Sequence, residues 1–142
     1  MTIQTVGIIG AGTMGNGIAQ ACAVSGIGVV MVDISDAAVQ KGLATVAGSL
    51  DRLIKKEKIS EADKAQALAL IQGSTNYDDL KSAQLVIEAA TENEGLKVKI
   101  LQQLDGLLHV LFVDGKGDIL GVLTANRLQN HIHVDIALAQ QI

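Results

Sequence analysis

The chain has 142 residues, a net charge of −4 and an apolar fraction of 49%, which is enough apolar side chain to build one globular core. Aromatic residues make up 1% of the chain, and an acidic chain with so few rings lacks the basic patches and stacking platforms of nucleic-acid binders. No apolar run reaches the roughly 20 residues that a membrane helix needs, and the first residues lack the basic segment of a signal peptide. We therefore expect a cytoplasmic protein that binds neither nucleic acid nor a membrane.

Cysteine and histidine give no support for a disulfide or a metal site. Cys22 is the single cysteine and cannot pair within the chain, so we expect it to be a small buried residue on a helix. His131 and His133 are two positions apart, which in a helix would place them on different faces. The sequence therefore predicts no metal ligand.

The first third of the chain alternates strand, helix and strand. Residues 5–9 are a mostly β-branched run that predicts a buried parallel strand. A glycine-rich turn at 10–17 opens a helix that ends before Gly26, and residues 28–32 predict a second strand.

Two helices are expected next. A serine and an aspartate at 35–36 can cap a helix with apolar residues at helical spacing over 37–53. Ser60 is followed three positions later by Asp63, which is the capping-box pattern in its aspartate form. It predicts a helix that continues to Gly73.

The alternation continues to residue 108. A polar connection at 76–81 precedes a strand at 85–89 and an amphipathic helix at 93–108. The order is strand, helix, strand, two helices, short strand, strand and helix. It predicts an α/β fold with a Rossmann-like parallel sheet flanked by helices.

The last third has a different pattern. Two short apolar runs, 109–113 and 119–123, are joined by an Asp-Gly-Lys-Gly-Asp segment that is typical of a hairpin turn. We expect this hairpin to extend the sheet beside a Rossmann strand and to be followed by a helix from residue 124 or 126 to the end.

We accordingly divide the chain into a Rossmann part, 1–108, and a hairpin–helix tail, 109–142, that completes or extends the same domain. A hairpin at the edge of a sheet leaves an open strand, and covering that strand with a second copy favours a homodimer.

The candidate chemistry lies between the first strand and the first helix. Gly10, Gly12 and Gly15 form the G-x-G-x-x-G pattern, in which the middle glycine lets the backbone approach a pyrophosphate at the helix N-terminus. Asp33 follows about 20 residues later at a strand end, where it can accept hydrogen bonds from ribose hydroxyls and repel a 2′-phosphate. The pattern predicts NAD rather than NADP as the cofactor. The competing interpretation is a glycine-rich turn beside a solvated aspartate.

Three segments, 7–19, 32–34 and 85–93, resemble the NAD-binding domain of 3-hydroxyacyl-CoA dehydrogenases, including the bacterial 3-hydroxybutyryl-CoA type. The resemblance covers about residues 3–108. It implies that NAD is held by residues of the glycine-rich loop and by the acid after the second strand, namely Gly10, Gly12, Thr13, Met14, Gly15 and Asp33.

The resemblance also assigns residues to the nicotinamide and to an acyl-CoA. Ala89, Glu92 and Lys97 would lie along the nicotinamide side of the cleft. Ser49 and Lys56 would help to hold the CoA moiety. The competing interpretations are a strand-end acid with a helix cap for Glu88 and Glu92, and a solvated helix end for the basic run around Lys56.

The chain has no match to the segments that carry the family's catalytic histidine, its acidic partner and an Asn-Thr-Ser-Ser sequence. Oxidation of a 3-hydroxyl needs a base within about 3 Å of the hydroxyl proton. His109, His131 and His133 stand in no matching context; we expect a strand-edge residue and two helix-surface or turn residues. We therefore assign no catalytic residue and expect no dehydrogenase activity in the isolated chain.

Residues 110–124 resemble the strand–turn–strand of a CBS (cystathionine-β-synthase-type) domain, which raises the hypothesis of a recombined or engineered chain. Three functions remain open at this point: an NAD-binding module, a dehydrogenase that acts with a partner chain, and a chimera of two fold fragments with a remnant NAD site.

Overall fold

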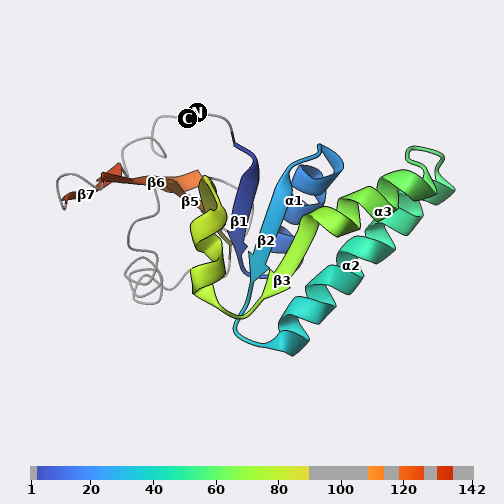
Figure 1. Ribbon diagram of the computed structural model, residues 1–142, viewed down its shortest axis with the longest axis horizontal. Coiled ribbons are helices and arrows are strands. Elements are labelled where there is room, and N and C mark those ends of the chain that lie inside the picture. The colour runs from blue at the N-terminus through green and yellow to red at the C-terminus, as the bar shows by residue number, and fades with distance from the viewer. Residues whose placement is uncertain (1–2, 90–108, 114–118, 127–130, 136–142) are drawn as a thin grey trace.

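The computed structural model describes residues 3–89, 109–113, 119–126 and 131–135, with side chains described in the first of these ranges (Figure 1). The expected helix at 93–108 lies outside the described residues. The helices are α1 (Thr13–Val24), α2 (Asp36–Lys55), α3 (Glu61–Leu70) and the 3₁₀ helix η1 (Tyr77–Ser82). The strands are β1 (Thr5–Ile9), β2 (Gly28–Val32), β3 (Ile71–Ser74), β4 (Leu85–Glu88), β5 (His109–Val113), β6 (Ile119–Asn126) and β7 (His131–Asp135).

The described strands form one sheet in the order β3-β2-β1-β4-β5-β6-β7. β1 lies between β2 and β4, and the pairs from β3 to β5 are all parallel. β6 and β7 are antiparallel to their neighbours. The parallel part confirms the Rossmann-like sheet flanked by helices, and β5 with β6 forms the expected hairpin at 109–123.

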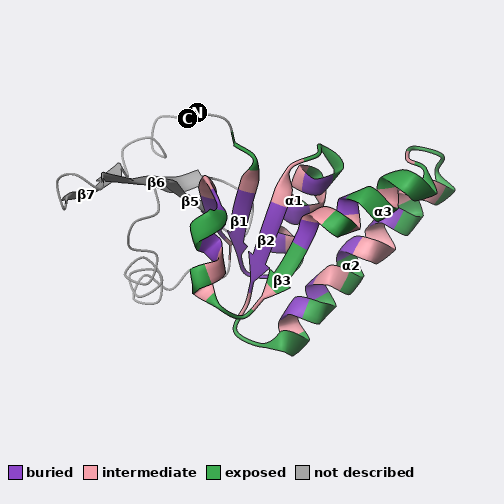
Figure 2. Cartoon of the chain, viewed as in Figure 1, coloured by how far each residue is buried: buried purple, intermediate pink, exposed green. Residues whose placement is uncertain are grey.

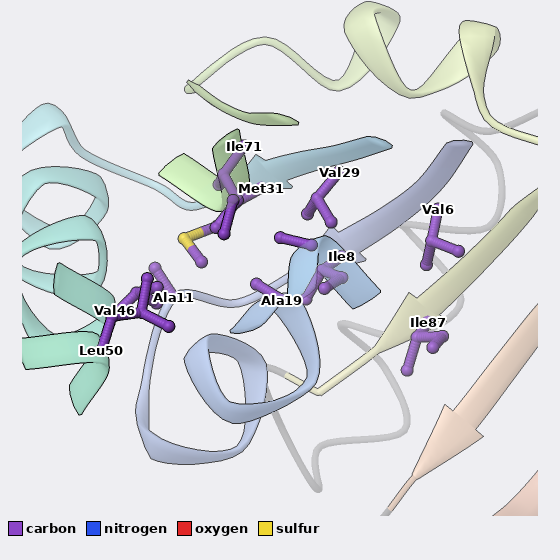
Figure 3. Packing of buried hydrophobic residues seen from close by; sticks show 12 residues of the cluster. Val6, Ile8, Ala11, Ala19, Val29, Met31, Val46, Leu50, Ile71 and Ile87 are labelled. Carbon is purple, nitrogen blue, oxygen red and sulfur yellow. The ribbon is translucent and has the colours of Figure 1, made fainter. Parts of the chain in front are cut away.

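Both faces of the parallel sheet are covered, because alternate residues of each strand point to opposite sides. Val6, Ile8, Val29 and Met31 join the cluster that packs against α1, α2 and α3, and Figure 3 shows these side chains together. The next residues along the strands form a second cluster with η1, made of Ile9, Val30, Val32, Leu80, Ala83 and Val86. Figure 2 shows buried residues along the strands and on the side of α2 that faces the sheet.

The helix predicted to reach Gly73 ends earlier, at Leu70, and this prediction was wrong. Residues 71–74 form β3, in which Ile71 pairs with Val29 of β2. A Cβ on Gly73 would lie 2.4 Å from a Val39 methyl, so the glycine lets α2 pack closely against this strand. The backbone hydrogen bonds that residues 71–74 make with the free edge of β2 stabilise a strand more than the helical spacing of Leu68 and Ile71 stabilises a longer helix.

The prediction of a single terminal helix from residue 124 or 126 was also wrong in its described part. β6 continues to Asn126, and residues 131–135 form the strand β7. The segment His-Ile-His-Val-Asp alternates polar and apolar residues with period two, which suits an antiparallel edge strand. His131 and His133 therefore belong to a strand and do not lie on a helix surface or turn.

Candidate cofactor site

The loop between β1 and α1 is held at the end of β2. The backbone N–H of Gly10 donates to the carbonyl of Val32 over 2.7 Å, and Gly10 has a φ of 106°, which favours glycine. A Cβ on Gly15 would lie 1.7 Å from the carbonyl oxygen of Gly10, so the first turn of α1 packs directly on the loop. Gly10 thus makes the tight turn and Gly15 allows the close packing, which are the roles that the G-x-G-x-x-G pattern gives to its first and third glycines.

The N-terminus of α1 differs from those of the other two α-helices in residues 3–89. The N-cap residues of α2 and α3 are Ser35 and Ser60, whose side chains accept hydrogen bonds from the first turn, and both first turns carry acids. The N-cap residue of α1 is Gly12, so this helix has no side-chain cap, and its first turn carries no acid. Its first N–H groups and the positive end of its dipole are thus available to an anion. A Cβ on Gly12 would meet nothing within 4 Å, so the space above this residue is open.

Asp33 follows the last residue of β2 and lies beside the loop. Its Oδ2 accepts a hydrogen bond from the backbone N–H of Ala11 at 2.8 Å, and its Oδ1 accepts from the N–H of Ile34 at 2.6 Å. These bonds fix the carboxylate at the open end of the loop while each oxygen keeps a further lone pair. The neighbouring Ile34 is 85% exposed, a large apolar side chain at the rim of the site.

A pocket of about 250 Å³ joins the loop, Asp33 and α2. Its lining residues come from three segments: Ala11, Gly12, Thr13 and Asn16 from the loop and α1, Asp33, and Ala38, Lys41 and Thr45 from α2. Gly42 lets α2 approach the loop closely, because a Cβ at this position would lie 2.7 Å from the carbonyl oxygen of Ala11. The sequence analysis identified Gly12, Thr13 and Asp33 in this pocket and missed its α2 wall. Met14, the remaining loop residue of the prediction, is half-buried in the first turn of α1.

The carboxyl end of β4 lies next to the same loop. Glu88 pairs in register with Ile9, and the backbone N–H of Ala89 donates to the carbonyl of Ile9 over 2.9 Å. Glu88 is fully buried, whereas Ala89 is half-buried at the sheet edge. The structure therefore places Ala89 beside the end of β1, and its contact with the nicotinamide stays a prediction. Glu92 and Lys97 lie outside the described residues.

Ser49 and Lys56 lie away from the pocket along α2. Ser49 is half-buried within the helix, and Lys56 is the exposed C-cap residue. They are seven positions apart, which is about two helical turns, so they share one side of the helix. Ser49 is four residues beyond Thr45, and this side of α2 therefore continues from the pocket wall.

Tyr77 at the start of η1 is a residue that the sequence analysis left without a function. Burial raises the pKa of its phenol, and the negative charges of Asp33 and Glu88 raise that pKa further. The tyrosine thus lies within electrostatic range of two acids at the carboxyl edge of the sheet.

Other kinds of site find no support in the described part of the chain. No group of three or more histidine, cysteine, aspartate or glutamate residues there is arranged to hold a metal ion. The helices of that part include none that is long and apolar enough to cross a membrane. Cys22 is free and half-buried, and burial raises the pKa of its thiol, as expected for a packing residue.

Comparisons with known proteins agree with this geometry. The sequence profile described as "3-hydroxyacyl-CoA dehydrogenase, NAD binding domain" matches residues 5–113. The crystal structure of (S)-3-hydroxybutyryl-CoA dehydrogenase from Ralstonia eutropha is 72% identical, with a TM-score of 0.73 over 80% of this chain and 41% of that chain.

Two further relatives share the same name. The 3-hydroxybutyryl-CoA dehydrogenase of Bradyrhizobium diazoefficiens is 43% identical over 106 residues, which cover 75% of this chain and 36% of the relative. The structure of the Escherichia coli enzyme of that name is 30% identical, with a TM-score of 0.73 over 80% of this chain and 25% of that chain. The chain thus spans less than half the length of these relatives.

Proposed function

Because the chain belongs to the 3-hydroxyacyl-CoA dehydrogenase family through its NAD-binding domain, we propose that NAD binds at the pocket between the glycine loop, Asp33 and α2. The observation that carries the proposal is the N-terminus of α1, which has no side-chain cap and no acid in its first turn and shares the pocket with the fixed carboxylate of Asp33. A nucleotide needs this combination, because its pyrophosphate is an anion and its ribose offers hydroxyl donors.

Each part of NAD has a partner in this proposal. The pyrophosphate lies on the N–H groups of residues 12–14 at the start of α1, where an added Cβ on Gly12 would occupy its space. Asp33 accepts hydrogen bonds from the adenosine ribose, and the exposed side chain of Ile34 packs on the adenine. The nicotinamide extends toward Ala89, and the family resemblance assigns Glu92 and Lys97 to the same part of the cofactor.

Titration with NAD and NADP tests this assignment. We expect NAD to bind more tightly than NADP, because the carboxylate of Asp33 repels a 2′-phosphate. Asp33→Asn keeps the shape and loses the charge, so NAD affinity falls about 10-fold or more, in the range for hydrogen bonds to a charged group. Asp36→Asn is the matched control, since Asp36 is an exposed acid that does not line the pocket. Equal affinity of the wild type for both cofactors contradicts the assignment.

The reaction that this domain serves is, by our proposal, the NAD-dependent oxidation of a 3-hydroxyacyl-CoA, as the names of the relatives indicate. Ser49 and Lys56 would then contact the CoA moiety along one side of α2. We further propose that the isolated chain binds NAD without turning over substrate, and that dehydrogenase activity would need a partner chain to supply the missing base.

The placement of the histidines supports that proposal. β5 is parallel to β4 and begins at His109, so this residue lies at the amino edge of the sheet, about 13 Å from the carboxyl edge. β7, with His131 and His133, lies three strands from β4, or about 14 Å. Neither position is within the roughly 3 Å that a general base needs. Turnover of acetoacetyl-CoA and NADH by the isolated chain at about 1 s⁻¹ or faster would contradict this proposal.

A further inference from the structure

The pocket beside the glycine loop carries one cation and one acid among its lining residues. Asp33 lies at the end of β2, and Lys41 lies on α2. Within residues 3–89, the side chains of Lys64 and Lys81 form salt bridges with Asp51 and Asp78, whereas Lys41 forms none. The ammonium group of Lys41 is therefore available to a ligand in the pocket.

The packing of α2 brings Lys41 near the N-terminus of α1. Gly42, the next residue, faces the carbonyl oxygen and Cβ of Ala11 so closely that no side chain fits between them. This contact fixes the distance between the first half of α2 and the loop, and both Lys41 and Thr13 line the same pocket. Two sources of positive potential, the lysine and the uncapped N-terminus of α1, thus converge on one volume.

The arrangement has a polarity that suits one half of a dinucleotide. The carboxylate of Asp33 can accept hydrogen bonds from hydroxyl groups, whereas Lys41 and the N-terminus of α1 attract anions. A volume of about 250 Å³ lies below the roughly 300–1,000 Å³ of sites that enclose a whole small ligand. It can take a ribose with its attached phosphate, while the rest of the ligand extends along the sheet edge.

We propose that Lys41 is a phosphate-binding residue of this pocket, where it contacts the pyrophosphate of NAD from the α2 side. This inference rests on the proposed function and adds a binding residue to it. Lys41 contributes a point charge to the pyrophosphate, whereas the N–H groups of α1 provide directed hydrogen bonds.

Isothermal titration calorimetry of wild type, Lys41→Ala and Lys41→Arg with NAD, ADP, adenosine and coenzyme A tests the proposal. We expect Lys41→Ala to weaken NAD and ADP by about 3- to 10-fold, in keeping with a partly exposed ion pair. Adenosine, which has no phosphate, should bind equally to the wild type and to Lys41→Ala, and Lys41→Arg should restore most of the affinity for NAD. At about 1 M salt, where the Debye length is about 3 Å, the difference between wild type and Lys41→Ala should shrink.

Lys55→Ala is the matched control, because Lys55 is an exposed lysine of the same helix that does not line the pocket. Unchanged NAD affinity in Lys41→Ala overturns the proposal, and so does an equal loss for adenosine, which would indicate a structural effect. A loss seen with coenzyme A but not with NAD also overturns it. If the wild type itself binds no NAD, the proposed function fails, and this outcome is distinct from a wild type that binds while the Lys41 variants bind equally well.

Discussion

Two glycines on α1, only two positions apart and therefore on nearly opposite sides of the helix, meet opposite environments. An added Cβ on Gly15 would lie 1.7 Å from the carbonyl oxygen of Gly10, and the same atom on Gly17 would meet nothing within 4 Å. The first contact involves backbone that is fixed by the hydrogen bond from Gly10 to Val32, so it has little freedom to move.

Alanine substitutions at these two positions should therefore have opposite effects on stability. Gly15→Ala should lower the free energy of unfolding by about 2 kcal/mol or more through overpacking and abolish NAD binding. Gly17→Ala should raise that free energy by about 0.5–1 kcal/mol, because alanine loses less backbone entropy in a helix. Urea denaturation of both variants measures the difference. A Gly15→Ala protein as stable as the wild type would show that the loop can move away.

Tyr77 offers a spectroscopic test of the electrostatics at the sheet edge, since it is the single tyrosine and the chain has no tryptophan. Burial raises its pKa first, and the charges of Asp33 and Glu88 raise it further. Asp33→Asn removes one of these charges, so the pKa of Tyr77 should fall toward its ordinary value. Alkaline titration followed by tyrosinate absorbance measures the change, with Asp36→Asn as the control that leaves it unaltered.

The sign of the accompanying stability change follows from the raised pKa. The folded protein holds the phenol proton more tightly than the unfolded chain does. The contribution of Tyr77 to stability is therefore complete below the ordinary tyrosine pKa of about 10 and is lost as the pH rises through the higher folded value. A pKa that stays the same in Asp33→Asn would contradict the placement of Tyr77 near that acid.

At the residue scale, the sequence predicted the wall of the pocket that is formed by the glycine loop and Asp33, and it did not predict the wall formed by α2. The glycine pattern and Asp33 are recognisable because a turn between a strand and a helix imposes specific residue types. Lys41 and Thr45 are four apart and so share one side of α2, but the sequence does not show which side meets the loop. That depends on the contact between Gly42 and Ala11, which joins residues distant in the chain.

The element scale is illustrated by α3, which begins with a complete capping box. The hydroxyl of Ser60 accepts from the N–H of Asp63 at 3.1 Å, and the Asp63 carboxylate accepts from the N–H of Ser60 at 2.9 Å. We expect Ser60→Ala to lower the free energy of unfolding by about 1 kcal/mol at neutral pH. Urea denaturation should show this change, with Ser25→Ala, an exposed serine at the end of α1, as the control.

The capping box should also be sensitive to acid. The hydrogen bond from the backbone of Ser60, followed by that involving its side chain, lowers the pKa of Asp63. A depressed pKa means that this contribution is present above the unfolded pKa of the carboxyl and is lost as the pH falls through the folded value. The difference in stability between wild type and Asp63→Asn should therefore narrow in acid, and a constant difference would show that the charge of the carboxylate takes no part.

The elements that were predicted correctly are those whose boundaries have local signals. The bounds of β1 and β2 agree with the prediction, and both serine caps lie where the pattern placed them. The errors concern β3 and β7, two strands whose backbone pairs with residues far along the chain or across a turn. The apolar residues of these segments also fit a helical spacing, and the periodicity within a short segment does not report the strand edge beside it.

At the scale of the whole molecule, the described sheet has two edges of different kinds. β3 forms one edge and has four residues, whereas β7 forms the other as the third strand of an antiparallel extension that begins at β5. β7 has five residues, so length does not distinguish the two edges, and both present unpaired N–H and C=O groups. The edge at β7 belongs to the hairpin extension, whose open strand we expected a second copy to cover.

We therefore predict that the protein forms a homodimer by pairing the β7 strands of two copies. Neighbouring residues of an edge strand direct their N–H groups alternately toward the sheet and away from it, so either Ile132→Pro or His133→Pro removes an outward donor and leaves the pairing with β6 in place. Light scattering should give twice the chain mass for the wild type. The variant whose proline replaces the outward donor should have the mass of one chain and an unchanged circular dichroism spectrum. A wild type that scatters as a monomer at all concentrations removes the dimer. A dimer that survives both proline substitutions must use another surface.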